Sequence, residues 1–403
     1  MRSLLFVAGR QLWARKLLNG LAIVSVMLGV FPIIAISGIL RGFQGKFVDT
    51  ILKNTPHVVL TLRQPGESPG AAFTLEDAEP GGKDPQSLMA EVERVPGVAR
   101  AAGSVSGMAL LRLAGRAVPV EVRGVEPARQ DETTPLKSNL TEGDFGAFAA
   151  SADGLLIGAG VARELKAKVG DRVRCVSATG GAAVLTISGV FETTVNLIDK
   201  TLVYLPLAKA QALFERTGQV DRIEVRLKDP GQADALAADL AARFSFPAES
   251  WRHANANFLG LFDQQNLIIS FVLSALLAVG GFGILAIQVM IVLQKRRDIA
   301  LLRSVGFRGR DVLLIFLFQG LMVAAAGSLL GAVEGHLALD LLRHTKVDSG
   351  ETFLHAETWI IWESPIQYLL AVSFALVVGL LSSAFPAWQA SQVEPVDVLR
   401  GQS

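Results

Sequence analysis

The sequence offers little that points to chemistry performed by the chain itself. Its one cysteine, Cys175, cannot form a disulfide within the chain, and we expect it to be a small buried apolar residue. The 403 residues contain no G-x-x-x-x-G-K-S/T phosphate loop and no H-E-x-x-H metal motif. A formal net charge of +1 argues against a nucleic-acid-binding protein, because such proteins usually carry a strong basic excess.

Weaker candidates for a site do not change this interpretation. The stretch "GSVSG" (Gly103 to Gly107) fits the G-x-S-x-G nucleophile motif poorly, because its serines flank the required central position. His336, His344 and His355 share one loop, but no cysteine or metal-like spacing accompanies them. We therefore expect no catalytic residues, no metal site and no cofactor in this chain.

Long apolar runs are what the sequence has instead. Apolar residues make up 51% of the chain and charged residues 19%, with a mean hydropathy of +0.42, which is typical of a chain partly in lipid and partly in water. Four runs reach the roughly 20 residues that a membrane helix needs: 19–40, 266–293, 312–333 and 366–385. Glycines 280, 281 and 283 lie inside the second run, where they favour close helix packing.

The cations between the runs predict an orientation. Four Lys or Arg residues precede the first run in segment 1–18, and six lie in the connection 294–311. The connection 334–365 has two, against six acids. The positive-inside rule therefore places both termini, including the tail 386–403, and the 294–311 connection in the cytoplasm. Segment 1–18 is expected to be an amphipathic cytoplasmic helix rather than a cleaved signal peptide.

The long excursion 41–265 lies on the other side in this interpretation. Strand patterns at 57–62 and 118–125, and a helical pattern at 86–98, predict an α+β domain. Two further alternating stretches are joined by Thr179–Gly180–Gly181, a plausible hairpin turn. Residues 63–85 are expected to be a loop or a disordered tip. The fold class is thus a membrane protein of four transmembrane helices with a large α+β extracytoplasmic domain between the first two.

Phenylalanines gather where this excursion meets the first two runs. They stand in "RGFQGKF" (41–47) and "FLGLF" (258–262). These residues are candidates for an acyl-chain or substrate contact, and an ordinary aromatic belt at the membrane surface is an equally open interpretation. The candidate residues are Phe43, Phe47, Phe258, Leu261 and Phe262.

The basic connection "QKRRDIALLRSVGFRGRD" (294–311) is amphipathic as well as charged. On a helix, Ile299, Leu302 and Val305 fall on one face, and Gly306 is a natural helix stop. One interpretation is a helix whose cations are held near anionic lipid headgroups. The other is a protein–protein contact in which a small apolar ridge enters a groove. The residues alone do not separate the two.

Two stretches carry a family resemblance that covers essentially the whole chain. The region 292–339, beginning "VLQKRRDIALLRSVGF", and the ending "PAWQASQVEPVDVLRG" (386–401) resemble the permease family that includes FtsX, MacB, LolC and LolE. The resemblance implies four spans in a bacterial inner membrane and a MacB-like periplasmic core domain. It also implies a dimer with a second permease, identical or paralogous, on two copies of a cytoplasmic ABC ATPase that binds the ATP and Mg.

The same resemblance implies that the helix in the 294–311 connection is a coupling helix seated in a groove of the ATPase. These permeases transmit motion to the periplasmic domain without a substrate path through the spans. The coupling residues carried over are Arg296, Arg297, Asp298, Ile299, Leu302, Arg303, Val305 and Gly306.

Within the family, the stretch 189–214 is most similar to the lipoprotein-releasing LolC and LolE type. That type implies a lipoprotein substrate, contact with membrane lipids, and a periplasmic carrier. One departure is that the place of the LolC hook, 177–183, reads "SATGGAA", which is short and has no proline. A MacB-like exporter with a separate ATPase and an FtsX-like regulator of a cell-wall hydrolase remain as alternatives.

Overall fold

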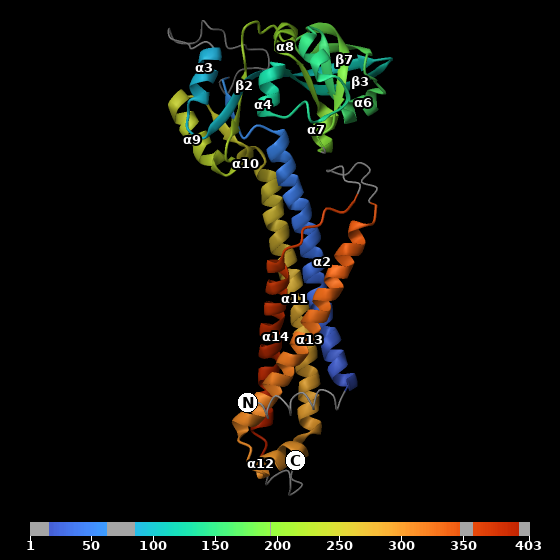
Figure 1. Ribbon diagram of the computed structural model, residues 1–403, viewed down its shortest axis with the longest axis vertical. Coiled ribbons are helices and arrows are strands. Elements are labelled where there is room, and N and C mark those ends of the chain that lie inside the picture. The colour runs from blue at the N-terminus through green and yellow to red at the C-terminus, as the bar shows by residue number, and fades with distance from the viewer. Residues whose placement is uncertain (1–15, 63–84, 194, 347–357, 395–403) are drawn as a thin grey trace. The chain divides into compact units, whose positions relative to one another are not determined.

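The computed structural model describes residues 16–62, 85–193, 195–346 and 358–394, and these divide into two compact units (Figure 1). The helical unit takes its described residues from 16–45, 261–346 and 358–394. The sheet unit takes its described residues from 46–260. Each unit is described below by itself.

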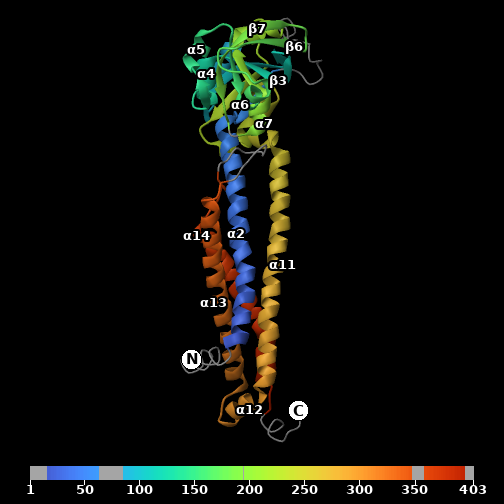
Figure 2. The same cartoon turned by 90° about the vertical axis from the view of Figure 1, so that its right-hand side faces the viewer.

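The described residues of the helical unit form four long helices and one short one (Figures 1 and 2). The long helices are each long and apolar enough to cross a membrane. The elements are α2 (Lys16–Asn54), α11 (Ala256–Gln294), α12 (Arg296–Ser304), α13 (Gly309–Arg343) and α14 (Pro365–Ser391).

Each predicted apolar run lies inside one of these helices, but the helices are longer than the runs. Counting apolar residues stops where charge begins, whereas backbone hydrogen bonding continues through polar positions. Helix α13 therefore extends to Arg343, so the first ten residues of the expected loop 334–365 are helical. Helix α11 is unbroken from Ala256 through Gln265, so the end of the excursion and the second run form one continuous helix.

Glycines let the long helices approach one another closely. On α13, Gly327, Gly331 and Gly335 face α2 at intervals of four residues. A Cβ atom at Gly327 would lie 2.7 Å from the carbonyl oxygen of Ile23, and one at Gly331 would lie 2.9 Å from that of Met27. Small residues at this spacing let helix backbones pack directly against each other, as in membrane helix pairs.

The glycines of α11 behave in the same way, as the sequence predicted. A Cβ atom at Gly280 would lie 2.8 Å from the carbonyl oxygen of Ser25 on α2. One at Gly281 would lie 2.6 Å from Oγ of Ser382 on α14. Three helices thus meet around this point of α11.

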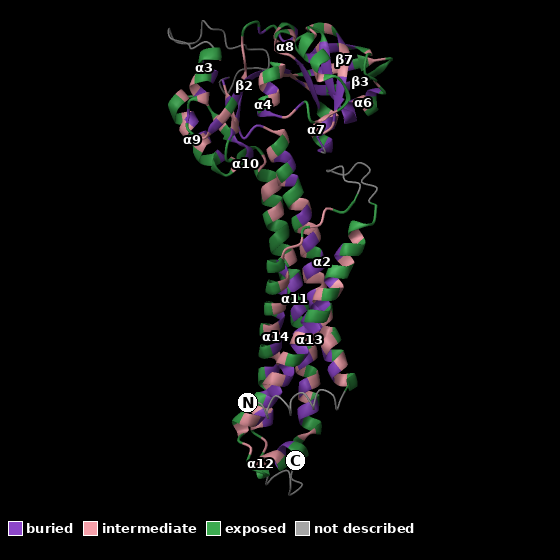
Figure 3. Ribbon diagram, viewed as in Figure 1, coloured by how far each residue is buried: buried purple, intermediate pink, exposed green. Residues whose placement is uncertain are grey.

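Outside 63–84 and 194, the sheet unit is built on ten strands in the order β10-β1-β9-β2-β3-β8-β5-β7-β4, with β6 paired to β2 and β7. Its inner strands are largely buried, while its helices expose their outer faces (Figure 3). The strands are β1 (Val58–Thr61), β2 (Val98–Leu113), β3 (Arg116–Val125), β4 (Leu140–Gly143), β5 (Gly154–Gly158), β6 (Arg172–Ser177), β7 (Ala182–Phe191), β8 (Leu202–Pro206), β9 (Arg222–Leu227) and β10 (Ala248–Ser250). The helices are α3 (Pro85–Glu93), α4 (Pro127–Thr133), α5 (Phe145–Ala150), α6 (Ala159–Leu165), α7 (Asn196–Thr201), α8 (Leu207–Leu213), η1 (Pro230–Gln232), α9 (Ala233–Phe244) and α10 (Trp251–Ala254).

Most predicted elements of the excursion are confirmed. The patterns at 57–62, 118–125 and 86–98 correspond to β1, β3 and α3. The hairpin joins β6 to β7, and Gly180 adopts the positive φ of 96° that its turn requires. The excursion is α+β, as expected. The expected loop at 63–85 lies, except for its last residue, outside the described residues, and so do 1–15 and 395–403.

The longest strand, β2, was not predicted, because its alanines, glycines and serines show no apolar alternation. One edge of β2 pairs with β3 over Ser104–Leu113. The other edge pairs with β9 up to Ser104 and with β6 from Ala109. Residues 105–108 therefore pair with no described strand on that edge, and a cavity lies there.

Candidate functional site

The short helix α12 begins directly after α11 and stops where the sequence predicted. Its last residue is Ser304, and Gly306 follows with a φ of 107°, a conformation that glycine adopts readily. Helix α13 then starts at Gly309, and the carboxylate of Asp311 accepts a hydrogen bond of 2.9 Å from the Arg308 backbone N–H. The two helices are thus joined by a short, tightly held connection.

One face of α12 is buried within the helical unit. Ile299 is 2% exposed and Ala300 is fully buried, and Ile299 packs in a cluster with Val312 and Phe316 of α13 and Ala387 of α14. This corrects the predicted ridge of Ile299, Leu302 and Val305. Ile299 anchors α12 inward, whereas Leu302 is half-buried and Val305 is 81% exposed.

The exposed face of α12 carries charge and one leucine. Arg296, Arg297 and Asp298 are exposed, and Leu301 is 50% exposed. Sequence reasoning missed Leu301, because a ridge chosen by spacing alone cannot say which of two apolar faces turns inward. A protein that docks on α12 would meet these four side chains and Val305.

Arg303, the last cation of α12, is turned toward α14. Its guanidinium donates hydrogen bonds to the backbone oxygens of Ser391, at 3.4 Å, and of Val393. It was predicted as part of the coupling surface, but its hydrogen bonds are made within the chain.

The predicted phenylalanines of α2 pair with those in the first turns of α11. The rings of Phe43 and Phe262 meet edge to face with centroids 6.2 Å apart, and those of Phe47 and Phe258 lie 5.6 Å apart. Leu261, the fifth predicted residue, is 59% exposed. The structure therefore brings four of the five together in two pairs, and leaves Leu261 open to a lipid or a partner.

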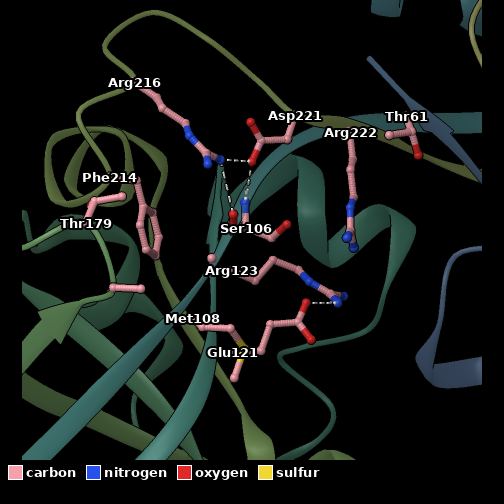
Figure 4. A pocket seen from close by; sticks show the side chains of 12 residues that line it. Thr61, Ser106, Met108, Glu121, Arg123, Thr179, Phe214, Arg216, Asp221 and Arg222 are labelled. Carbon is pink, nitrogen blue, oxygen red and sulfur yellow. Dashed lines mark hydrogen bonds and ion pairs between the residues drawn. The ribbon is translucent and has the colours of Figure 1, made fainter. Parts of the chain in front are cut away.

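A cavity of about 450 Å³ opens in the sheet unit, at the free edge of β2 (Figure 4). The backbone of Ser106, which lacks a strand partner there, is bonded by side chains instead. Its N–H donates to the Asp221 carboxylate at 3.0 Å, and its carbonyl oxygen accepts from Arg216 at 3.3 Å. Arg216 and Asp221 also form an ion pair with each other. Arg216 and Asp221 thus satisfy the backbone of β2 in the gap between the segments that pair with β9 and β6.

A second arginine of the cavity, Arg123, belongs to a buried charge cluster. Arg123 donates to Glu121 at 3.1 Å and lies 3.7 Å from the carboxylate of Glu224. Burial lowers the pKa of Arg123, but the carboxylates of Glu224 and Glu121 outweigh it and hold the pKa above its usual value. Burial also raises the pKa of neighbouring Tyr204 to about 12. Glu224 is 2% exposed and accepts further hydrogen bonds from Ser104 and Gln130. These bonds and the nearby Arg123 guanidinium stabilise its buried negative charge.

The third arginine, Arg222, has no ion-pair partner among the described residues. It lies along the cavity wall between Arg123 and Thr61 (Figure 4). The cavity therefore presents a free guanidinium that can pair with an anionic group. No motif could have revealed this, because β3, the α8–β9 connection and β9 supply the three arginines from distant parts of the sequence.

The hairpin turn at 177–183, the place that corresponds to the LolC hook, lies against the same cavity. The Ala178 N–H donates to the Met108 carbonyl oxygen at 3.2 Å, and Thr179 lines the cavity. A Cβ atom at Gly181 would lie 2.2 Å from the carbonyl oxygen of Leu213, so the turn packs on the domain. The segment 177–183 is thus a packed turn and not a projecting hairpin.

Comparison with known proteins agrees with this arrangement. Residues 20–243 match the MacB-like periplasmic core domain, and residues 270–395 match the FtsX-like permease C-terminal region. The chain is 28% identical to the lipoprotein-releasing system transmembrane protein LolC of Xylella fastidiosa, across 94% of this chain and 92% of LolC. It is 27% identical to LolE of Haemophilus influenzae, across 93% and 92% of the two chains. It is 24% identical to the macrolide export ATP-binding/permease protein MacB of Bdellovibrio bacteriovorus, across 97% of this chain and 60% of MacB.

Four membrane-length helices joined to a large α+β domain define a membrane permease with an extracellular domain. The chain belongs to the family of ABC transporter permeases that combine a MacB-like periplasmic core domain with an FtsX-like permease region. Its similarity to LolC and LolE over nearly the whole length is what the resemblance predicted.

Proposed function

We propose that this chain is a permease subunit that transmits ATP-driven motion to a periplasmic domain and thereby releases lipoproteins from the inner membrane to a periplasmic carrier. The observation that carries the proposal is α12, a short helix with a buried apolar face and an exposed charged face. Its buried face joins it to α13 and α14, so force applied to its exposed face would reach the membrane helices. The lipoprotein cargo is supported by the similarity to LolC and LolE.

In this proposal the termini and α12 are cytoplasmic and the sheet unit is periplasmic. A separate ATPase, present in two copies, binds ATP and Mg and docks on Arg296, Arg297, Asp298 and Leu301. A second permease, identical or paralogous, completes the dimer. The chain itself catalyses no reaction, consistent with a sequence that contains no phosphate loop.

The interior of the helical unit supports transmission of motion rather than conduction. Its core cluster is formed by apolar residues such as Val26, Val30 and Ile284, and glycines bring the helices into backbone contact. Polar side chains are buried there too, and two of them, Gln319 and Gln367, donate hydrogen bonds to α2. Such packing resists compression, so a displacement at one end of a helix is passed on to its neighbours. A substrate would then move along the periplasmic side, and the exposed Leu261 would face its acyl chains.

A second candidate function is an exporter that works on a small molecule or peptide in the periplasm. One observation favours it over lipoprotein release, and a second favours it over an FtsX-like role. The turn at 177–183 is packed on the sheet unit, so it offers no projecting element to capture a carrier. The match to MacB also extends over 97% of this chain.

The test is reconstitution of the permease with its co-purified ATPase in proteoliposomes that contain a lipidated substrate. With a purified periplasmic carrier outside, addition of ATP should transfer the lipoprotein to the soluble fraction. The control compares a triacylated and an unlipidated version of the same substrate. ATP should increase the soluble fraction of the triacylated version only. If ATP drives no release of any lipoprotein but does move a small molecule or peptide, the exporter proposal replaces this one.

A further inference from the structure

The C-terminus of α14 is closed by a side chain from another helix. The last carbonyl oxygens of an α-helix have no partner within the helix and carry its negative partial charge. The guanidinium of Arg303 donates to one such oxygen, that of Ser391, the last residue of α14, and to the carbonyl oxygen of Val393, two residues past the helix. A planar cation with several donors suits this position, because it can bond both carbonyls at once.

The same end of α14 is also contacted by a residue of α12 and by the first residue of α13. Ile299 is buried in a cluster with Ala387 and Ala390 of α14, and Val393 packs against that cluster. Beyond α12, a Cβ atom at Gly309 would lie 2.9 Å from the Ser391 carbonyl oxygen, so this backbone also touches α14. Two elements, α12 and the start of α13, thus enclose one helix end.

The other two arginines of α12 differ from Arg303. Arg296 and Arg297 are exposed, and neither makes a hydrogen bond or an ion pair with any other described residue. The three share a helix and a charge, but only the Arg303 guanidinium binds another helix within the part of the chain that the structure describes. Arg296 and Arg297 are therefore accessible to a partner, whereas Arg303 is engaged within the chain.

We infer that Arg303 is a positioning residue that fastens α12 to the end of α14, so that the two move as one body. Under the proposed function, which this inference deepens, a push on α12 then reaches α14 directly and not only through the connection to α13. Loss of Arg303 would leave the docking face intact but would loosen α12 from the end of α14, because only the apolar cluster around Ile299 would then hold the two together.

The clamp itself can be tested without any ATPase. In a Cys175→Ala background, spin labels at Val305→Cys and Gln392→Cys report the distance between the ends of α12 and α14, and both positions are exposed. In the full chain in nanodiscs, we expect a narrow distance distribution that widens about twofold with Arg303→Gln, because both bridging hydrogen bonds are lost. Arg297→Gln removes the same charge from the exposed face and should leave the width unchanged. Arg303→Lys keeps the charge but lacks the Nη1 atom that donates both bonds, and should give an intermediate width.

Transmission is tested next with the same variants and the co-purified ATPase. Arg303→Gln should retain ATPase binding but lose most of the ATP-dependent distance change between α12 and α14 seen in the parent. An unchanged width of the distance distribution in Arg303→Gln would overturn the inference. If this variant also lost ATPase binding, Arg303 would belong to the docking surface instead. If the parent chain itself binds no ATPase, the proposed function fails, while the distance widths still decide whether the clamp exists.

Discussion

Arg226, on strand β9, donates a hydrogen bond of 2.9 Å to the carbonyl oxygen of Leu52 in the last turn of α2. The same guanidinium also reaches the carbonyl oxygens of Lys53 and Thr133, at 3.3 Å each. Within the sheet unit, a central strand thus closes a helix end with an arginine, as Arg303 does for α14 in the helical unit.

Replacement of Arg226 should destabilise the sheet unit. Arg226→Gln leaves the helix-end carbonyls of α2 without their charged donor, which costs about 1–3 kcal/mol for hydrogen bonds to a charged group. We expect a melting temperature several degrees below that of the parent, measured by differential scanning fluorimetry of the full chain in detergent. Arg222→Gln, four residues away on the same strand, removes an arginine without a described ion-pair partner. An equal drop in both variants would contradict the assignment.

The sheet unit should lose stability as the pH falls below the ordinary range of histidine. The Nδ1 atom of His57 accepts from the Leu227 N–H at 3.1 Å, and its Nε2 donates to the Leu52 carbonyl oxygen. The bond accepted by Nδ1 needs the neutral ring, because a protonated imidazole has no acceptor nitrogen. Burial, with a contribution from Arg226, lowers the pKa of His57 below 6.5. Below pH 6.5 the unfolded chain therefore binds a proton that the folded chain resists, and the stability falls.

The measurement is the melting temperature of the full chain between pH 7.5 and 5.5, compared with that of His57→Gln. The variant should be less stable at pH 7.5 but should show a shallower decline toward acid. Parallel curves for the two proteins would mean that His57 does not contribute to the acid sensitivity.

Cys175 should be unreactive in the folded protein. It is fully buried, and burial raises the pKa of its thiol to about 12, so almost no thiolate exists at neutral pH. We expect maleimide at pH 7.5 to modify the chain only after denaturation, as followed by mass spectrometry. As a control, Thr179→Cys in a Cys175→Ala background places a thiol on the exposed hairpin turn and should react within minutes. Rapid labelling of native Cys175 would show that the strand opens.

A side chain at Gly331 should disturb the contact between α13 and α2. A Cβ atom there would meet the Met27 carbonyl oxygen at 2.9 Å, which is closer than real side chains come to backbone. Gly331→Leu should therefore cost about 1–3 kcal/mol of packing strain and lower the temperature of aggregation in detergent. Gly20→Leu is the matched control, because no atom lies within 4 Å of its Cβ position.

The exposed and buried sides of α12 should respond differently to an acidic residue. Leu301→Asp changes an exposed side chain, so the protein should insert normally into membranes but fail to co-purify with its ATPase. Ile299→Asp would bury a charge in the cluster between α11, α13 and α14, and should reduce the yield of folded protein itself. Co-purification of the ATPase at the parent level with Leu301→Asp would disprove the docking surface.

The sequence predicted the features that depend on local pattern. The apolar runs, the cation counts and the β6–β7 turn are visible over short windows, and Gly306 ends α12 as its position predicts. The direction of the faces of α12 was not predictable, because both Ile299 and Leu301 are apolar and only tertiary packing decides which one turns inward.

Features that depend on pairing between distant parts of the sequence were also not predictable. Strand β2 has no alternating pattern of its own and is defined by its neighbours β3, β9 and β6. The cavity beside it gathers Arg123, Arg216 and Arg222 only through that pairing. The role of Arg303 was likewise hidden, since its two acceptors lie about ninety residues further along the chain.

The glycines of α13 that face α2 recur every four residues, and this period limits how the two helices can slide. A shift of one full glycine interval, about 6 Å along the axis at 1.5 Å per residue, would again place glycines opposite α2. Any smaller shift would press the side chains between them against the α2 backbone. The two helices therefore have discrete registers rather than a continuous range, and a movement along this contact would proceed in steps of one glycine interval.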